Sequence, residues 1–219
     1  DGNGCTATDT IVLTEPTAVV ATATSLSDET CSGDCDGTLN ASGMGGIGSY
    51  SYDWYSPGPG FGQTHAYQCP GTYSVAVFDD NGCADTASTT IAAGTLLTSV
   101  IDPIGNQCLS GNSYSFNGGN STISLGTITS YIWDFGDGGS ASGAAPIYTY
   151  GAPGTYTVTL TVGDGICTAF ETLNIFVYPD PAVSIISTSG PACTGLSDGT
   201  ATASGSGGTG TLDYSWSPS

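Results

Sequence analysis

Asp and Glu are the most abundant ionisable residues in this sequence. The chain contains 19 Asp and Glu residues and one His but no Lys or Arg, so its formal net charge at pH 7 is −19. Because Lys and Arg are absent, this repulsion must be screened by salt or by bound cations. Calcium prefers carboxylate and carbonyl oxygens, and it competes here with diffuse cation screening as the interpretation. The candidate calcium ligands form two groups, Asp79, Asp80 and Asn81, and Asp134, Asp137 and Asp164.

The same composition excludes several classes of function. Proteins neutralise nucleic acids and anionic membrane surfaces with Lys and Arg, so neither is an expected partner. No apolar run approaches the roughly 20 residues of a membrane-spanning helix, so direct membrane insertion is not expected. The single histidine, His65, has no neighbouring residues that suggest a catalytic triad. We therefore predict no catalytic residue and no cofactor other than calcium.

The cysteines indicate the compartment in which the chain folds. Eight cysteines accompany 34 glycines, and the apolar residues show no helical periodicity. This composition is typical of an oxidising, extracellular setting in which cysteines form disulfides. Zinc is the alternative for Cys31, Cys35, Cys69 and Cys83, which fall in one segment. Structural zinc sites usually bring two closely spaced pairs of ligands, and only the first two of these cysteines are close, so disulfides are favoured.

Alternating residues identify the strands that must position these groups. Apolar residues alternate with Thr over residues 155–162, which is the pattern of a half-buried β-strand. A second alternating run, residues 131–135, ends at a glycine-rich turn over residues 136–139. Tyr156 enters its strand directly after Pro153-Gly154-Thr155, as the tyrosine corner of immunoglobulin-like sandwiches does. We therefore predict an all-β chain of tandem immunoglobulin-like β-sandwich modules.

Two motifs in this region carry a family resemblance. Tyr-x-Trp-Asp-Phe-Gly-Asp-Gly at residues 131–138 is followed by Pro-Gly-Thr-Tyr-Thr-Val-Thr-Leu at residues 153–160. Together they closely resemble the PKD (polycystic kidney disease) domain, and the resemblance covers residues 95–180. It implies that Asp134 is a structural turn residue that accepts hydrogen bonds from backbone amides. The paired carboxylates of Asp134 and Asp137 are therefore not interpreted as the acid pair of a glycosidase.

The rest of the chain is organised as an internal repeat. Cys5 and Cys83 occupy equivalent positions 78 residues apart, and Cys31 and Cys193 do so 162 residues apart. We predict that residues 17–94 form one complete module. Residues 1–16 are then the final strand of an incomplete module, and residues 181–219 are the N-terminal half of a further one.

The repeat also resembles a known family. Its pattern is Cys-x-Gly-x-x-x-Asp-Gly-Thr, then Tyr-x-Trp, then Gly-Thr-Tyr-x-Val-x-Val, then Asp-x-Asn-Gly-Cys. This pattern resembles the SprB repeat of very long surface adhesins in gliding Bacteroidetes, although Cys35 and Cys69 depart from the usual repeat. The resemblance implies a secreted protein of the bacterial cell surface, with many modules and with neighbouring modules of the same chain or filament as its partners. In that group, Asp-Ser/Thr-aliphatic sequences mark O-glycosylation, which implies candidate sites at Thr10 and Thr86.

The favoured function is the stalk or filament of a cell-surface adhesin. Its alternative is a spacer or carbohydrate-binding accessory region of a secreted multidomain enzyme, because fold alone does not determine function. For a surface polysaccharide, the best candidate ligand-binding residues are Tyr55 and Phe61, which flank a loop rich in Pro and Gly. Trp54 is assigned to the core instead, because Trp recurs at the equivalent positions Trp133 and Trp216.

Strand geometry limits the pairing of the cysteines. A strand of six or seven residues separates the two ends of a sandwich by about 20 Å, whereas a disulfide tolerates about 7 Å between Cα atoms. A bond between Cys31 and Cys83 is therefore not expected. We predict a bond between modules, Cys31 with Cys167, and a bond within the second module, Cys35 with Cys69. Cys31 and Cys35 could exchange these roles.

Overall fold

The computed structural model describes residues 2–56 and 59–217 and divides the chain into two compact units, Asp1–Leu96 and Leu97–Ser219. The outermost ends of the predicted segments 1–16 and 181–219 lie outside the described residues. Within those residues every regular element is a strand, and no helix is long and apolar enough to cross a membrane. The predicted all-β fold class is confirmed, while the finer division into modules stays a prediction.

The first unit is a sandwich of two antiparallel sheets, with strand orders β1-β2-β5 and β4-β3-β6-β7. Its strands are β1 (Val20–Ser27), β2 (Gly37–Met44), β3 (Ser51–Ser56), β4 (Gly60–Phe61), β5 (Thr64–Gln68), β6 (Gly71–Phe78) and β7 (Ala84–Ile91). Alternation along β6 directs Tyr73, Val75 and Val77 into the core. Trp54 of β3 is fully buried among them, and its indole N–H donates to the Gly62 carbonyl. The assignment of Trp54 to the core is thus correct.

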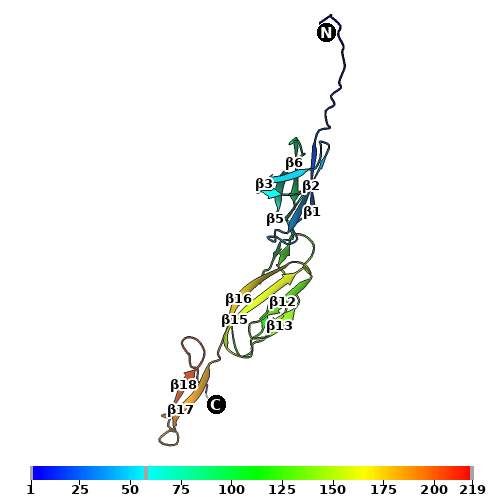
Figure 1. Cartoon of the computed structure of the whole chain (residues 1–219). Helices are drawn as coiled ribbons and strands as arrows, with labels where there is room; N and C mark the ends of the chain where they lie inside the picture. The colour runs from blue at the N-terminus through cyan, green and yellow to red at the C-terminus, as the bar shows by residue number, and fades with distance from the viewer. Residues whose placement is uncertain (1, 57–58, 218–219) are drawn as a thin grey trace. The chain divides into compact units, whose positions relative to one another are not determined.

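The second unit begins with a sandwich built around one larger sheet. Its five strands have the order β13-β12-β15-β16-β9, and Figure 1 shows β12, β13, β15 and β16 side by side. The strands of this sheet are β9 (Gln107–Cys108), β12 (Ser130–Asp134), β13 (Ser140–Ser142), β15 (Gly154–Gly163) and β16 (Thr168–Tyr178). The two remaining pairs are β8 (Leu97–Thr98) with β11 (Thr122–Ile123), and β10 (Tyr114–Ser115) with β14 (Ile147–Tyr148).

An aromatic core fills this second sandwich. Trp133, Phe116 and Phe135 are buried together, with ring centroids 5.2–6.5 Å apart. The tyrosine corner forms as expected, because the Tyr156 hydroxyl donates to the Ala152 carbonyl at 2.8 Å. Tyr73 of the first unit makes the same bond four residues back, to Cys69. The two units therefore have the same tyrosine-corner hydrogen bond at the entry to β6 and β15.

A two-stranded hairpin follows this sandwich in the second unit. It consists of β17 (Ala182–Ser189) and β18 (Thr200–Ser206). The hairpin repeats β1 and β2 of the first unit, since Val20 pairs with Met44 and Ala182 pairs with Ser206, each 162 residues further along. Both hairpins also carry a one-residue register shift, between Ser25 and Ser27 and between Ile185 and Ser187. The internal repeat seen in the sequence is thus also a repeat of backbone structure.

Candidate functional site

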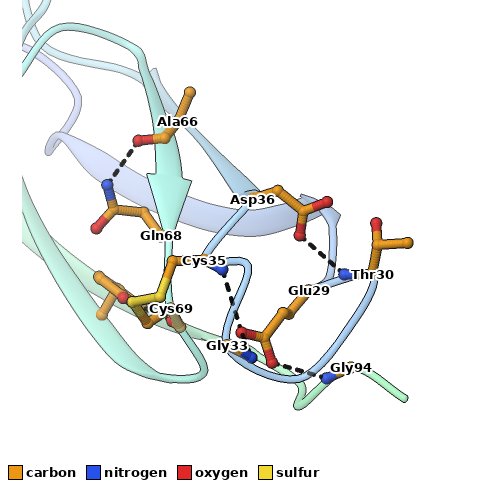
Figure 2. Close-up of a disulfide and its surroundings, with 10 residues drawn as sticks. Glu29, Thr30, Gly33, Cys35, Asp36, Ala66, Gln68, Cys69 and Gly94 are labelled. Carbon is orange, nitrogen blue, oxygen red and sulfur yellow. Dashed lines mark hydrogen bonds between the residues drawn. A yellow bond between two sulfur atoms is a disulfide. The ribbon is translucent and has the colours of Figure 1, made fainter. Parts of the chain in front are cut away.

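A disulfide and several hydrogen bonds hold the loop between β1 and β2 in the first unit (Figure 2). A disulfide joins Cys35 in this loop to Cys69, which directly follows β5. Cys35 has a φ of 51°, in the left-handed region that non-glycine residues rarely adopt. The bond predicted within the module is therefore present, and it fixes the loop to the turn between β5 and β6.

Glu29 is a buried carboxylate at the centre of this loop. Only 6% of the residue is exposed, and its two carboxylate oxygens accept backbone N–H bonds from Gly33 at 2.9 Å, Cys35 at 3.2 Å and Gly94 at 3.0 Å. The hydrogen bond from Gly94 makes the largest contribution to lowering the pKa of Glu29, against the opposing effect of burial. Glu29 is therefore charged in the folded protein, and its charge is satisfied by backbone donors rather than by a cation.

The loop also holds the segment that leaves the first unit. Ala92 donates its backbone N–H to the Asp28 carboxylate at 3.0 Å, and Thr95 donates to the Thr30 carbonyl at 3.0 Å. Ser32 donates in return to the Thr95 carbonyl at 2.9 Å. A Cβ on Gly94 would lie 2.7 Å from the Glu29 carbonyl oxygen, so only glycine allows this approach.

We call this assembly the exit clamp, meaning loop residues 28–36 with Cys69 and residues 92–95. Hydrogen bonds tie the outgoing segment to the loop, and the disulfide ties the loop to the turn between β5 and β6. Sequence reasoning found Cys35 and Cys69 but missed Glu29. The available signal was an acidic residue just before a cysteine-rich loop in a chain without Lys or Arg. The pairing of Cys31 with Cys167 stays a prediction.

The residues of the first proposed calcium group lie in a turn that the Asp79 carboxylate caps. Asp79 is buried, and its carboxylate accepts backbone N–H bonds from Ile47 at 2.9 Å, Asn81 at 3.0 Å and Cys83 at 2.9 Å. These bonds lower the pKa of Asp79, with the bond from Ile47 contributing most. Asp80 points elsewhere and accepts a hydrogen bond from the Ser49 hydroxyl at 2.8 Å. The carboxylates that were expected to bind an ion are thus already engaged with the protein.

The second proposed calcium group is wrong, because strand register separates its members. Asp134 lies opposite Thr159, whereas Asp164 follows Gly163 at the far end of the same ladder. From Thr159 to Asp164 the chain advances five residues, which corresponds to about 17 Å of strand. Asp134 caps the turn by accepting the N–H of Gly136 at 2.8 Å, as the PKD resemblance implies.

The other two members of that group have comparable local roles. Asp137 accepts the Tyr148 hydroxyl at 2.9 Å, and Asp164 accepts the N–H groups of Ile166 at 2.9 Å and Cys167 at 2.7 Å. Among the described residues, no three His, Cys, Asp or Glu side chains are grouped so as to hold a metal ion. Turn capping therefore replaces the calcium assignment of Asp134, Asp137 and Asp164. Calcium binding by Asp79, Asp80 and Asn81 stays a prediction.

The aromatic and glycosylation candidates lie at the surface. Phe61 pairs with Asp53 across the β3–β4 ladder, which places it on the same outward face as Tyr55. Tyr55 is 53% exposed and Phe61 is 82% exposed, so both remain candidates for a sugar-stacking pair. Thr10 and Thr86 are both exposed and open to modification.

The single histidine, His65, lies at the border of the core of the first unit. It lies on edge strand β5 but is only partly exposed, and its ring stacks on Trp54 with centroids 5.8 Å apart. The ring also meets the edge of Tyr73, at a centroid distance of 6.4 Å. His65 therefore has a packing role at the border of the core.

The PKD resemblance is supported by comparison with known proteins. Residues 100–177 match the family described as the PKD domain. The PKD1 domain of Vibrio anguillarum Epp, whose crystal structure is known, is 33% identical to this chain, with a TM-score of 0.31. That match covers 38% of this chain and 92% of the Vibrio domain.

Longer proteins share shorter stretches with this chain. The microbial collagenase of Vibrio alginolyticus is 44% identical over 54 residues, which is 25% of this chain and 7% of the collagenase. The pre-pro-metalloprotease PrtV of Vibrio cholerae is 52% identical over 44 residues, which is 20% of this chain and 5% of the protease. The chain therefore spans only a small part of the curated relatives that it matches.

Proposed function

We propose a function from the premise that this chain belongs to the PKD domain family through residues 100–177. The function is that of a non-catalytic accessory region in a secreted, extracellular multidomain enzyme. The observation that carries the proposal is the similarity of stretches of this chain to a collagenase and a metalloprotease, of which the matched stretches are 7% and 5%. On the sequence alone this was the alternative to an adhesin stalk, and the relatives favour it over that first interpretation.

Hydrogen bonds within each unit hold the segment at which the chain leaves that unit, as a spacer between domains requires. In the first unit the exit clamp holds residues 92–95 against the loop that carries Cys35. In the second unit the segment after β16 is held in a similar way, since Leu109 donates to the Tyr178 carbonyl at 2.8 Å and Ser110 donates to the Asp180 carboxylate at 2.9 Å. Pro179 and Pro181 stiffen the same segment. A spacer whose outgoing segments are held by hydrogen bonds limits the movement of the domains attached to it.

Antibodies against this chain test the proposal in a culture of the source organism. The antibodies should capture a secreted polypeptide whose peptides, identified by mass spectrometry, include a hydrolase domain. The captured protein should cleave a protein substrate, whereas the purified chain of 219 residues should not. Capture of a polypeptide that contains only further β-sandwich repeats would overturn the proposal.

A second candidate function, the stalk of a cell-surface adhesin, is favoured by the internal repeat. The hairpins β1–β2 and β17–β18 repeat at a spacing of 162 residues, as expected of a long tandem array. On this proposal the repeats are of the SprB type, and neighbouring modules are the partners. Cys31 and Cys167 then join modules, glycans occupy Thr10 and Thr86, and Tyr55 with Phe61 contacts surface polysaccharide. Release of the protein by brief protease treatment of intact cells would favour this candidate.

A further inference from the structure

The outward face of the large sheet in the PKD domain carries an exposed apolar row. Ile132 of β12 pairs with Thr161 of β15, and Thr161 pairs with Phe170 of β16, so these three side chains cross the sheet on one face. Ile132 is 56% exposed and Phe170 is 71% exposed. Neighbouring strands lie about 5 Å apart, so about 10 Å separates the backbones that carry the two apolar side chains. Both side chains therefore meet solvent, with Thr161 between them.

The corresponding row of the first unit lacks these two large apolar side chains. The two ladders can be aligned because buried Trp54 pairs with Val75 just as buried Trp133 pairs with Leu160. In the next row of each ladder the first unit has Asp53, Ala76 and Thr86, and the PKD domain has Ile132, Thr161 and Phe170. The sandwich itself therefore does not require Ile or Phe at these positions.

Polar side chains surround the apolar pair. The neighbouring positions on the same face hold Ser130, Ser142, Thr159, Thr168 and Thr172. Exposed Asp134 lies two residues beyond Ile132 on this face, and Asp164 follows Gly163 at the opposite end of the ladder. The apolar row thus lies between two carboxylates. Exposed apolar patches with a polar rim are typical of interaction surfaces.

Electrostatics distinguishes between the partners that this face could bind. The chain has no Lys or Arg, so it cannot pair Asp134 or Asp164 with either cation from its own sequence. A second copy of the chain would bring a further net charge of −19, and other acidic partners would be repelled in the same way. A basic partner is attracted instead, and its cations can approach the carboxylates on both sides of the apolar row.

We propose that this face binds a basic protein partner, whose docking segment carries two apolar side chains between Lys or Arg residues. The apolar side chains cover Ile132 and Phe170, and the cationic side chains approach Asp134 and Asp164. Along the strands these two carboxylates are about 17 Å apart, and the end residues of an extended seven-residue segment are about 20 Å apart. The proposal is independent of whether the chain serves an enzyme or an adhesin.

A short peptide supplies the test. The probe is Lys-Thr-Leu-Thr-Phe-Thr-Lys, capped at both ends, which places Leu and Phe between the two Lys residues on one face when it is extended. It is titrated into the isotope-labelled complete chain at low ionic strength, and the backbone amide signals are followed by NMR. We expect saturable shifts of the signals of Ile132, Thr161 and Phe170. The equivalent row of the first unit should not respond, and it serves as the internal control.

Matched chain variants separate the apolar and the charged contributions. The double variant Ile132→Thr with Phe170→Thr keeps strand-forming residues and should bind at least roughly tenfold more weakly, because burial of Phe170 alone is worth about this factor. Its Tm should stay unchanged, since both positions are exposed. Asp134→Asn keeps an oxygen that can cap Gly136 but removes the charge, so it should weaken binding at low salt and reduce the salt dependence.

Matched peptides make the same separation without altering the chain. Replacing both Lys residues of the probe by Glu should abolish the shifts, because the peptide is then repelled. Replacing Leu and Phe by Ser should weaken binding at least roughly tenfold, because no apolar side chain is then buried.

Five results would overturn the proposal. The first is the absence of any shift with the probe, and the second is equal binding of the probe by the double variant. The third is equal binding of the Glu peptide. The fourth is a chain that sediments as a dimer and that the double variant makes monomeric, since the occupant would then be a second copy. The fifth is a larger shift of the same signals with cellohexaose, since the occupant would then be a neutral glycan.

Discussion

Gly136 offers the sharpest test of the packing in the PKD domain. It follows Trp133-Asp134-Phe135 and has a φ of +80° in the turn after β12. A Cβ at this position would lie 2.7 Å from the Thr157 carbonyl oxygen and 3.0 Å from the Thr157 nitrogen, both of which are β15 backbone atoms. Gly138, two residues further on, has a similar φ of +93° but no atom within 4 Å of a built Cβ. The two glycines therefore differ in crowding but not in backbone conformation.

This difference sets the expected destabilisation. Alanine in the left-handed region costs about 1 kcal/mol, which is the whole effect expected for Gly138→Ala. Gly136→Ala adds the cost of crowding a packed region, about 1–3 kcal/mol, for a total of about 2–4 kcal/mol. In a domain of this size, 1 kcal/mol lowers Tm by roughly 4–8 °C. We therefore expect a fall of roughly 5 °C for Gly138→Ala and of at least roughly 10 °C for Gly136→Ala.

Differential scanning calorimetry of the complete chain measures both variants. Hydrogen exchange of peptides from β15 identifies which thermal transition belongs to the PKD domain. The transition of the first unit should stay in place in both variants and serves as the internal control. Equal shifts for the two alanine variants would refute the account, because they would mean that contact with the Thr157 backbone contributes nothing.

Three further predictions concern acid, protease and disulfides. Hydrogen bonds from backbone N–H groups lower the pKa of Glu29 and Asp79 below their ordinary values of 4.5 and 3.8, so Tm should hold above about pH 5 and fall as the pH drops through the folded-state pKa values. A Tm that rises on acidification would show that relief of the −19 charge dominates. Trypsin should leave even the unfolded chain intact, since it has no Lys or Arg; ready tryptic cleavage would contradict the sequence. A non-reduced chymotryptic digest should yield one peptide pair linking Cys35 to Cys69 and another linking Cys31 to Cys167, whereas a Cys31–Cys83 pair or free thiols at Cys31 and Cys167 would contradict the predicted pairing.

Local patterns predicted much of the fold. The alternation of Val75 and Val77, and of Val158 and Leu160, fixes which face of each strand is buried, because side chains of a strand alternate between faces. Trp54 could be assigned to the core because Trp133 recurs in the same motif. Such features are encoded within a few residues of each other, so a single sequence reveals them.

Features that depend on long-range register could not be predicted. Glu29 meets Gly94, 65 residues away, and nothing near either residue specifies that contact. The calcium group Asp134, Asp137 and Asp164 was wrong for the same reason, since the distance between Asp134 and Asp164 follows from the pairing of β12 with β15. The burial of Asp79 by the loop that contains Ile47 is likewise a tertiary effect. In each case, carboxylates that the sequence shows as free acids are used to satisfy backbone donors.

Immunodepletion tests the central claim most directly. Antibodies against residues 97–180 would be used to deplete the culture medium of the source organism, and the proteolytic activity left in the medium would be measured by zymography. The account predicts that one band of protease activity is removed and is recovered in the captured material, together with peptides of this chain. Capture of the chain with all protease activity left in the medium would contradict its assignment to a secreted enzyme.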